Sequence, residues 1–355
     1  LATFTDTLAR ALKTKLLRLL GGEIRVAEQI EVQSLSALGS RLYKAQIGEA
    51  DLADQKQVGE IIQDASTRIG NHKFSPSFLL AEWEQVADAW QLKTWEEYRD
   101  VARLGRKTRL PEAQRQTLWS IFEIVRKELR NRNLVTEAER FNALAKAITN
   151  KQAVIFDHAV VDEAQDISVA HLRFFAALGN DRSNALFFAG DLGQRIFQQP
   201  FSWKSLGVDI RGRSRTLRVN YRTSHQIRTR ADRLLGPVVN DVDGNTEERN
   251  KTVSVFNGVA PLIDGFDDET EEINVIGQWL SKLADRGIPA HEFGVIVRSA
   301  SQIPRAVKAV EASGMNYKVL DVDIETTAGH VSISTMHLAK GLEFRAVAIM
   351  ACDDE

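Results

Sequence analysis

From Ala153 to the end of the chain, short apolar runs alternate with stretches of helical periodicity. An apolar run bounded by turn signals predicts a buried strand, and strands that alternate with helices predict parallel α/β sheets. The candidate strands are Val154–Val161, Ala185–Ala189, Thr216–Val219, Phe293–Val297, Val331–Ser334 and Ala346–Ala351. The same pattern predicts helices over Glu271–Ala284 and Ile303–Ala312, and an exposed turn over Asn240–Asn250.

The stretch from about Ser40 to Asn150 has a different pattern, with many helix formers and few strand-like runs. Its tryptophans are spaced as on helix faces, which favours core packing over a binding role; they are Trp83, Trp90, Trp95 and Trp119. Lys107–Arg132 is rich in basic residues, a pattern typical of a solvated face, with contact to a polyanion as the alternative. We therefore expect a helical subdomain here.

Composition narrows the class of protein. The chain has 355 residues, 46 Lys and Arg against 48 Asp and Glu, and a formal net charge of −2. These values indicate an ordinary globular protein of about two domains, in which any nucleic-acid site is a local patch. The single cysteine, Cys352, excludes a disulfide scaffold and a cysteine-based zinc site. No apolar run approaches the roughly 18 residues of a membrane span.

Polar residues follow two of the predicted strands. Asp162 and Glu163 come where the run ending at Val161 stops. In open parallel sheets ligands bind beyond the carboxyl ends of the strands, where one carboxylate can hold Mg²⁺ and a second can deprotonate an attacking water. The alternative is a helix cap followed by an acidic first turn.

The next strand ends in Gly190-Asp191-Leu192-Gly193-Gln194, where a carboxamide can sense a γ-phosphate. Two adjacent strand ends of this kind are harder to explain as helix caps. The aromatic residues Phe197, Phe201 and Trp203 follow without helical spacing. Stacking on unpaired bases and packing in the core are both open for each ring.

Residues Arg211–Arg230 contain seven arginines and no acidic residue. Within them, Arg222 directly follows Asn220 and Tyr221, which suits a clamp on a transferring phosphoryl group or a contact with a nucleic-acid backbone. Near the end of the chain, the segment Val331–Phe344 contains His337, which taken singly reads as a loop residue with a hydrogen-bond partner.

Taken in order, these segments resemble the UvrD/Rep-like branch of superfamily 1 DNA helicases. The resemblance rests on five motifs, and their ordered set is more specific than any one of them: Thr3-Phe4-Thr5, Asp162-Glu163-Ala164-Gln165-Asp166, Gly190-Asp191-x-x-Gln194, Asn220-Tyr221-Arg222 and Thr335-x-His337-x-x-Lys340-Gly341-Leu342-Glu343-Phe344. The family implies two RecA-like α/β domains of the P-loop NTPase type with parallel sheets and a helical insertion in the first. The expected domains are residues 1–39 and 151–215 for the first, 40–150 for the insertion, and 216–355 for the second.

The resemblance also implies roles for individual residues. Asp162 would serve Mg²⁺, and Glu163 would be the base for water attack on ATP. Gln194 and Arg222 would face the γ-phosphate and Tyr221 the adenine, with Gly341 and Glu343 near the nucleotide. The residues expected along single-stranded DNA are Thr3, Phe4, Thr5, Phe197, Trp203, Thr335 and His337.

Three departures from the family are visible. The chain has no Gly-Lys dipeptide, so the phosphate-binding loop is missing. We therefore expect a fragment that lacks this loop and the closing motif of the family. Such a fragment is expected to be inactive alone. About 115 residues separate Asn220 from Thr335, which leaves no room for the large helical subdomain of the best-known relatives. Residues 32–36 stand where relatives carry a histidine beside the DNA.

The implied activity is an ATP-dependent DNA helicase or translocase, a hydrolase with ATP and Mg²⁺ as cofactors, that moves 3′ to 5′ in DNA repair or recombination. Expected partners are single-stranded DNA and its junctions with duplex, with possible repair or nuclease partners and no membrane. The expected location is cytoplasmic, at the nucleoid in a bacterium. Two alternatives stay open, a helicase-like subunit of a nuclease-coupled complex and a non-catalytic DNA-binding relative.

Overall fold

The computed structural model describes residues 1–103, 110–152, 154–180, 182–191, 194, 200–234, 238–248, 251–320, 327–336, 338–339 and 342–353. It divides into two compact units, Leu1–Thr5 with Leu12–Pro261, and Asp6–Ala11 with Leu262–Glu355. Within the described ranges, no helix combines the length and apolar character needed to cross a bilayer.

A four-stranded parallel sheet lies in the first unit, in the order β2-β1-β5-β6. Its strands are β1 (Ala2–Thr3), β2 (Gln33–Ser34), β5 (Ala159–Val161) and β6 (Leu186–Phe188). Ala2 pairs with Gln33 on one side and with Val161 on the other, so the first strand of the chain is central in the sheet. The predicted parallel sheet is confirmed, although β5 occupies only the end of the apolar run that begins at Val154.

The shortening of β5 has a local cause. The Arg182 guanidinium donates hydrogen bonds to the carbonyl oxygens of Phe156 and Asp157, at 2.8 and 3.0 Å. These carbonyls are therefore held by a side chain and not by a neighbouring strand, and regular pairing begins at Ala159.

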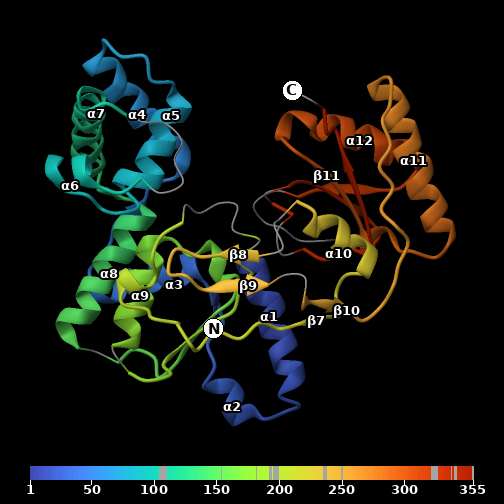
Figure 1. Cartoon of the computed structure of the whole chain (residues 1–355), viewed down its shortest axis with the longest axis horizontal. Helices are drawn as coiled ribbons and strands as arrows, with labels where there is room; N and C mark the ends of the chain where they lie inside the picture. The colour runs from blue at the N-terminus through green and yellow to red at the C-terminus, as the bar shows by residue number, and fades with distance from the viewer. Residues whose placement is uncertain are drawn as a thin grey trace. The chain divides into compact units, whose positions relative to one another are not determined.

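Helices α3 (Leu35–Gln46), α8 (Glu137–Lys151) and α9 (Val169–Gly179) pack together in this unit, as Figure 1 shows, and share one apolar core with the sheet. Each begins at a side-chain cap, from Ser34, Thr136 and Ser168 respectively. Such caps satisfy backbone N–H groups of the first turn and fix where the helix starts. Two further helices, α1 (Asp6–Leu19) and α2 (Ile24–Glu28), follow β1.

A helical insertion with its own core separates α3 from α8. It consists of α4 (Gln55–Ile69), α5 (Pro76–Glu82), a π-helical turn (Trp83–Ala87), α6 (Trp95–Asp100) and α7 (Glu112–Asn131), enclosed by a parallel pair of short strands, β3 (Asp51–Leu52) and β4 (Leu134–Val135). Trp83 and Trp119 are buried in this core, and Trp90 and Trp95 pack against it. The core interpretation of the tryptophans is thus confirmed.

Asp88 connects the insertion to the start of α8. Its Oδ1 accepts hydrogen bonds from the Thr136 hydroxyl at 2.8 Å and from Gln91 Nε2 at 2.6 Å. Burial of the carboxylate raises the pKa of Asp88 to about 7, although both hydrogen bonds act in the opposite direction. This side chain therefore changes charge near neutral pH.

The rest of the first unit consists of short elements. Strands β7 (Val219–Asn220) and β10 (Val253–Ser254) form a separate parallel pair next to α10 (His225–Asp232), so the strand predicted over Thr216–Val219 forms only at its end and outside the main sheet. The segment Asn240–Asn250, predicted as an exposed turn, contains the turn and second strand of a β-hairpin formed by β8 (Val238–Asn240) and β9 (Thr246–Glu248).

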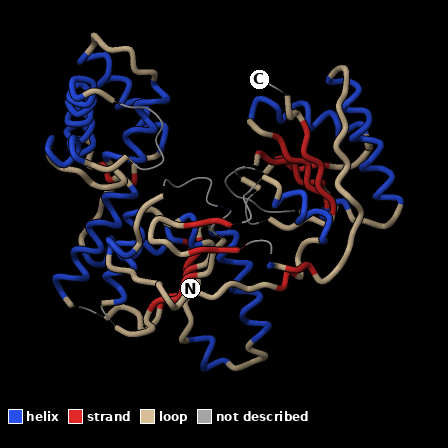
Figure 2. The backbone as a smooth tube through the Cα atoms, viewed as in Figure 1, coloured by secondary structure: helices blue, strands red, loops and turns tan. Residues whose placement is uncertain are grey.

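The second unit contains a parallel sheet in the order β12-β13-β11-β14, whose strands lie side by side in Figure 2. They are β11 (Phe293–Val297), β12 (Tyr317–Val319), β13 (Val331–Thr335) and β14 (Ala346–Met350), with the helices α11 (Glu269–Asp285) and α12 (Ile303–Ala312) packed together and onto the same core. Every residue of β11 and β13 is buried. The predicted strands and helices of this region are confirmed to within two residues.

Candidate active site

The carboxyl ends of β1, β5 and β6 meet at one edge of the first sheet. The Asp162 amide donates to the carbonyl oxygen of Ala2 at 3.0 Å, which holds the end of β5 against β1. On the other side, the Ala189 amide donates to Val161 O and the Ala164 amide to Ala189 O, both at 2.8 Å. The segments predicted to carry the chemistry are therefore adjacent in space, as the rule for parallel sheets requires.

Glu163 has an unusual backbone at this edge. Its φ and ψ are +54° and 39°, in the left-handed region that residues other than glycine rarely occupy. A single 3₁₀ turn, Ala164–Asp166, follows and is fully buried. Strained backbone of this kind is concentrated at functional sites, where the surrounding structure holds it in place.

The side chain of Gln165 bridges the two strand ends, which sequence reasoning missed. Its Nε2 donates to Glu163 Oε2, and its Oε1 accepts the backbone amide of Asp191 at 3.0 Å. Gly190 makes this possible, because a Cβ atom there would lie 2.6 Å from Gln165 Oε1 and 3.0 and 3.1 Å from the backbone nitrogens of Gln165 and Ala164. Only glycine fits so close an approach.

Gln194 is hydrogen-bonded to Asp191 at the end of β6. Its Nε2 donates to Asp191 Oδ2 at 2.9 Å, and its backbone amide donates to Asp191 O at 3.0 Å. Asp191 thus contacts both Gln165 and Gln194, which brings the predicted γ-phosphate sensor into the cluster that contains Glu163.

The end of β1 is anchored in the core. Thr3 is buried, and its Oγ1 has no hydrogen-bond partner among the described residues. The Phe4 ring packs edge-on against His171 with 6.1 Å between the ring centroids, and His171 in turn bonds Glu137 at 3.0 Å. Thr5 is half-buried. Contact of these three residues with DNA stays a prediction.

Trp203 is held by the β8–β9 hairpin. The Asp243 carboxylate in its turn accepts the Ser202 hydroxyl at 2.5 Å and the backbone amides of Trp203 and Lys204 at 2.7 and 3.1 Å. Burial acts to raise the pKa of Asp243, but these hydrogen bonds outweigh it and the pKa lies below its ordinary value. The Trp203 ring is half-buried and packs edge-on against Phe188 with 4.9 Å between centroids.

The structure describes one of the two other aromatic residues of this region, Phe201, but not Phe197. Phe201 is buried in the core of the first unit, so core packing is the correct interpretation for that ring. Phe197 lies outside the described residues.

A turn presents Tyr221 and Arg222 to solvent. Asn220 Oδ1 accepts the backbone amides of Arg222 and Thr223 at 2.8 and 3.2 Å, an Asx turn of the kind asparagine favours. The Tyr221 side chain is 75 % exposed. Arg222 is exposed as well, and binding of a ligand by either residue stays a prediction.

In the second unit, Thr335 ends β13 as a buried residue and Glu343 is exposed in the segment before β14. Phe344 fixes that segment, because its ring lies where a Cβ of residue 294 would be, 2.6 Å from the nearest ring atom, and Gly294 leaves the space. His337 and Gly341 lie outside the described residues.

The donor set at Asp162 and Glu163 suits Mg²⁺, which is typically held by one or two carboxylates, substrate phosphates and its own waters. Among the residues that the structure describes, no group of three or more His, Cys, Asp and Glu side chains is placed to bind a metal.

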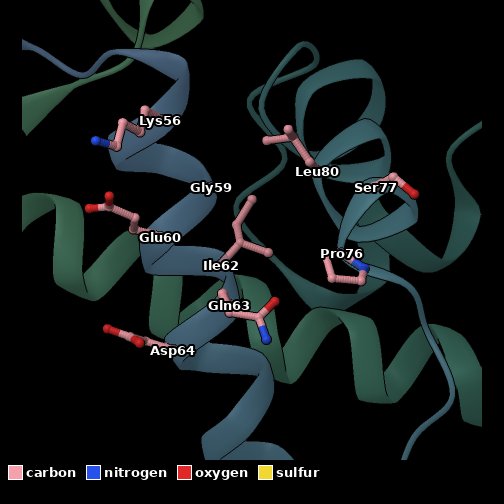
Figure 3. Close-up of a pocket in the computed structure, with 9 residues that line it drawn as sticks. All are labelled: Lys56, Gly59, Glu60, Ile62, Gln63, Asp64, Pro76, Ser77 and Leu80. Atoms are coloured by element: carbon pink, nitrogen blue, oxygen red, sulfur yellow. The ribbon is translucent and has the colours of Figure 1, made fainter. Parts of the chain in front are cut away.

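A pocket of about 490 Å³ lies elsewhere, between α4 and α5 of the insertion (Figure 3). Ile62 and Leu80 form its apolar wall, whereas Lys56, Glu60 and Asp64 extend from the other side of α4. The pocket has no convergent set of catalytic groups among its lining residues. The better candidate for chemistry is therefore the strand-end cluster, which consists of Asp162, Glu163, Gln165, Asp191 and Gln194.

Comparison with known families gives a match. Residues 1–202 match the family described as the UvrD/REP helicase N-terminal domain, while no curated protein gives a significant match to the chain. The matched stretch is more than half of the chain and contains the first sheet, the insertion and the strand ends at Glu163 and Asp191. The chain therefore belongs to the UvrD/Rep helicase family.

Proposed function

We propose that this protein is an ATP-dependent DNA helicase or translocase that couples ATP hydrolysis to movement along single-stranded DNA. The observation that carries the proposal is the adjacency of Asp162 and Glu163 with Asp191 and Gln194 at one sheet edge. A module that only binds DNA has no need of a carboxylate pair beside a carboxamide sensor.

The proposed chemistry is the attack of water on the γ-phosphate of ATP. Bound Mg²⁺, held through Asp162, would neutralise charge on the phosphates. Glu163 accepts a proton from the water as its oxygen bonds to the γ-phosphorus, and the bond to the β–γ bridging oxygen breaks to release ADP. Gln194 and Arg222 contact the γ-phosphate oxygens, and Tyr221 stacks on the adenine.

The proposed architecture is a pair of RecA-like domains, 1–215 interrupted by the insertion 40–150, and 216–355. Gly341 and Glu343 complete the nucleotide site in this proposal. Single-stranded DNA contacts the end of β1, the aromatic residues Phe197 and Trp203, and the end of β13 with His337. Movement 3′ to 5′, duplex unwinding and a role in repair or recombination are part of the proposal by analogy with the family.

The test is ATP hydrolysis by the polypeptide as its gene encodes it, with and without single-stranded DNA. Glu163→Gln removes the base but keeps the shape, and we expect a decrease in kcat of about 10²–10⁴-fold with DNA binding retained. The exposed substitution Asp64→Asn on α4 is the matched control and leaves kcat unchanged. Hydrolysis at the wild-type rate in Glu163→Gln contradicts the assigned base.

A second outcome separates the enzyme from a binding protein. If the wild-type polypeptide binds single-stranded DNA but hydrolyses no ATP, the non-catalytic DNA-binding alternative replaces the proposal. Strand displacement from duplexes with a 3′ or a 5′ tail tests the direction, and we expect release from the 3′-tailed duplex.

A further inference from the structure

Gln165 is a buried polar side chain whose two ends are both used. Gln165 is only 4 % exposed. The carboxamide orientation follows from chemistry, since a carboxylate such as Glu163 can only accept and the Asp191 amide can only donate. The NH₂ group must therefore face Glu163, and the oxygen must face Asp191.

The sheet does not need this side chain for its own pairing. The ends of β5 and β6 are already joined by backbone hydrogen bonds of Ala164 and Ala189. An apolar side chain of the same shape would fill the space but would remove the hydrogen bonds to the Asp191 amide and the Glu163 carboxylate. A glutamine here instead requires glycine at 190 and coincides with the left-handed backbone of Glu163.

We infer that Gln165 is a positioning residue for the proposed reaction, which fixes the Glu163 carboxylate and ties it to the strand end that bears Gln194. The inference rests on the proposed function, because it gives a role to a side chain that does not itself touch the reacting atoms.

The connection has two steps. Gln165 holds the Asp191 amide, and the Asp191 carboxylate accepts Gln194 Nε2 at 2.9 Å. If Gln194 and Asp191 move, the Gln165 carboxamide moves with them and changes the position of the Glu163 carboxylate. The orientation of Glu163 and the position of Gln194 are set together.

Two substitutions separate the two hydrogen bonds. Gln165→Met keeps the length of the side chain and removes both bonds. Gln165→Glu keeps an acceptor for the Asp191 amide but replaces the neutral donor by a second carboxyl group against Glu163, which repels that carboxylate or shares a proton with it. The exposed Gln63→Met on α4 is the matched control for the glutamine-to-methionine change. Each variant is made in the gene-encoded polypeptide.

Three quantities are measured for each variant: kcat, KM for ATP, and hydrogen exchange of the segment that contains Asp191. We expect kcat to fall about 10–100-fold in both Gln165 variants, with KM changed less than about threefold. Exchange at Asp191 accelerates in Gln165→Met and stays slow in Gln165→Glu. The control matches the wild type in all three.

Other results overturn the inference. Wild-type kcat in both Gln165 variants removes the positioning role. Parallel changes of kcat and KM in both variants, with hydrogen exchange at Asp191 accelerated in both, show a structural role only. If the wild-type protein hydrolyses no ATP, the proposed function fails and the inference with it, whereas an active wild type with unaffected Gln165 variants rejects the inference alone.

Discussion

Replacing Gly190 by alanine tests the geometry of the strand-end cluster directly. The added Cβ would lie 2.6 Å from Gln165 Oε1, and 3.0 and 3.1 Å from two backbone nitrogens. Gln165 cannot swing away without losing its bonds to Glu163 and Asp191, and the backbone nitrogens belong to a buried turn. The backbone of Gly190 is not left-handed, so the effect is one of space alone.

We expect Gly190→Ala to destabilise the first unit by about 1–3 kcal/mol, the usual result of forcing a methyl group into a packed region. For a domain of this size that corresponds to a decrease in Tm of roughly 2–4 °C for each kcal/mol. ATP hydrolysis should fall as well, because the displaced carboxamide no longer holds Glu163.

The control is Gly59→Ala in the interior of α4, where a Cβ would meet nothing within 4 Å. This substitution should stabilise the helix by about 0.5–1 kcal/mol, since alanine is the better helix former. Thermal unfolding followed by circular dichroism, with ATP hydrolysis, measures both variants. Equal stability of Gly190→Ala and wild type would refute the close approach described here.

Two further predictions concern carboxylates outside the cluster. Because the pKa of Asp88 is about 7 in the folded protein and near 3.8 unfolded, the native state binds more protons between these values, and stability falls as pH rises from about 4 to about 7. Asp88 keeps some exposed surface, so Asp88→Asn should remove about 1–3 kcal/mol of this fall, measured by urea unfolding at pH 5 and pH 8; an unchanged pH profile contradicts the shift. Asp243→Ala removes three hydrogen bonds around Trp203 and should cost about 1–2 kcal/mol and weaken binding of single-stranded DNA, whereas Asp209→Ala, which breaks an exposed pair with Arg211, should change neither. DNA affinity equal in both variants would show that the Trp203 segment takes no part in binding.

The apolar pattern predicted the second unit best. Strand β11 is buried along its whole length, and a strand buried on both faces reads as a continuous apolar run. Strand β13 is equally buried, but its sequence alternates valine and isoleucine with serine. Strands β1 and β2 have two residues each, too few for any periodicity, so the sequence alone did not reveal them. Strand β1 also pairs with β5, which lies far along the chain.

The candidate site was predictable only in part. Asp162 and Glu163 were found because acidic residues follow an apolar run, and Gln194 because it follows the next one. Gln165 belongs to the second motif, but the sequence did not show that it bridges the strand ends, since its two partners become neighbours only when β5 and β6 pair. The contact of Asp243 with Trp203 escaped for the same reason, because about 40 residues separate the two.

The pair of strands at the base of the insertion bears on how the chain reaches its native state. Ala2 pairs with Val161, roughly 160 residues away, and contacts so distant in sequence form slowly. Pairing of Asp51 with Leu134 brings the two ends of the insertion together and shortens the loop that the sheet must close. An insertion with its own core can fold before the sheet does. Because its folding would hold the two flanking segments close together, it would speed assembly of the sheet around β1.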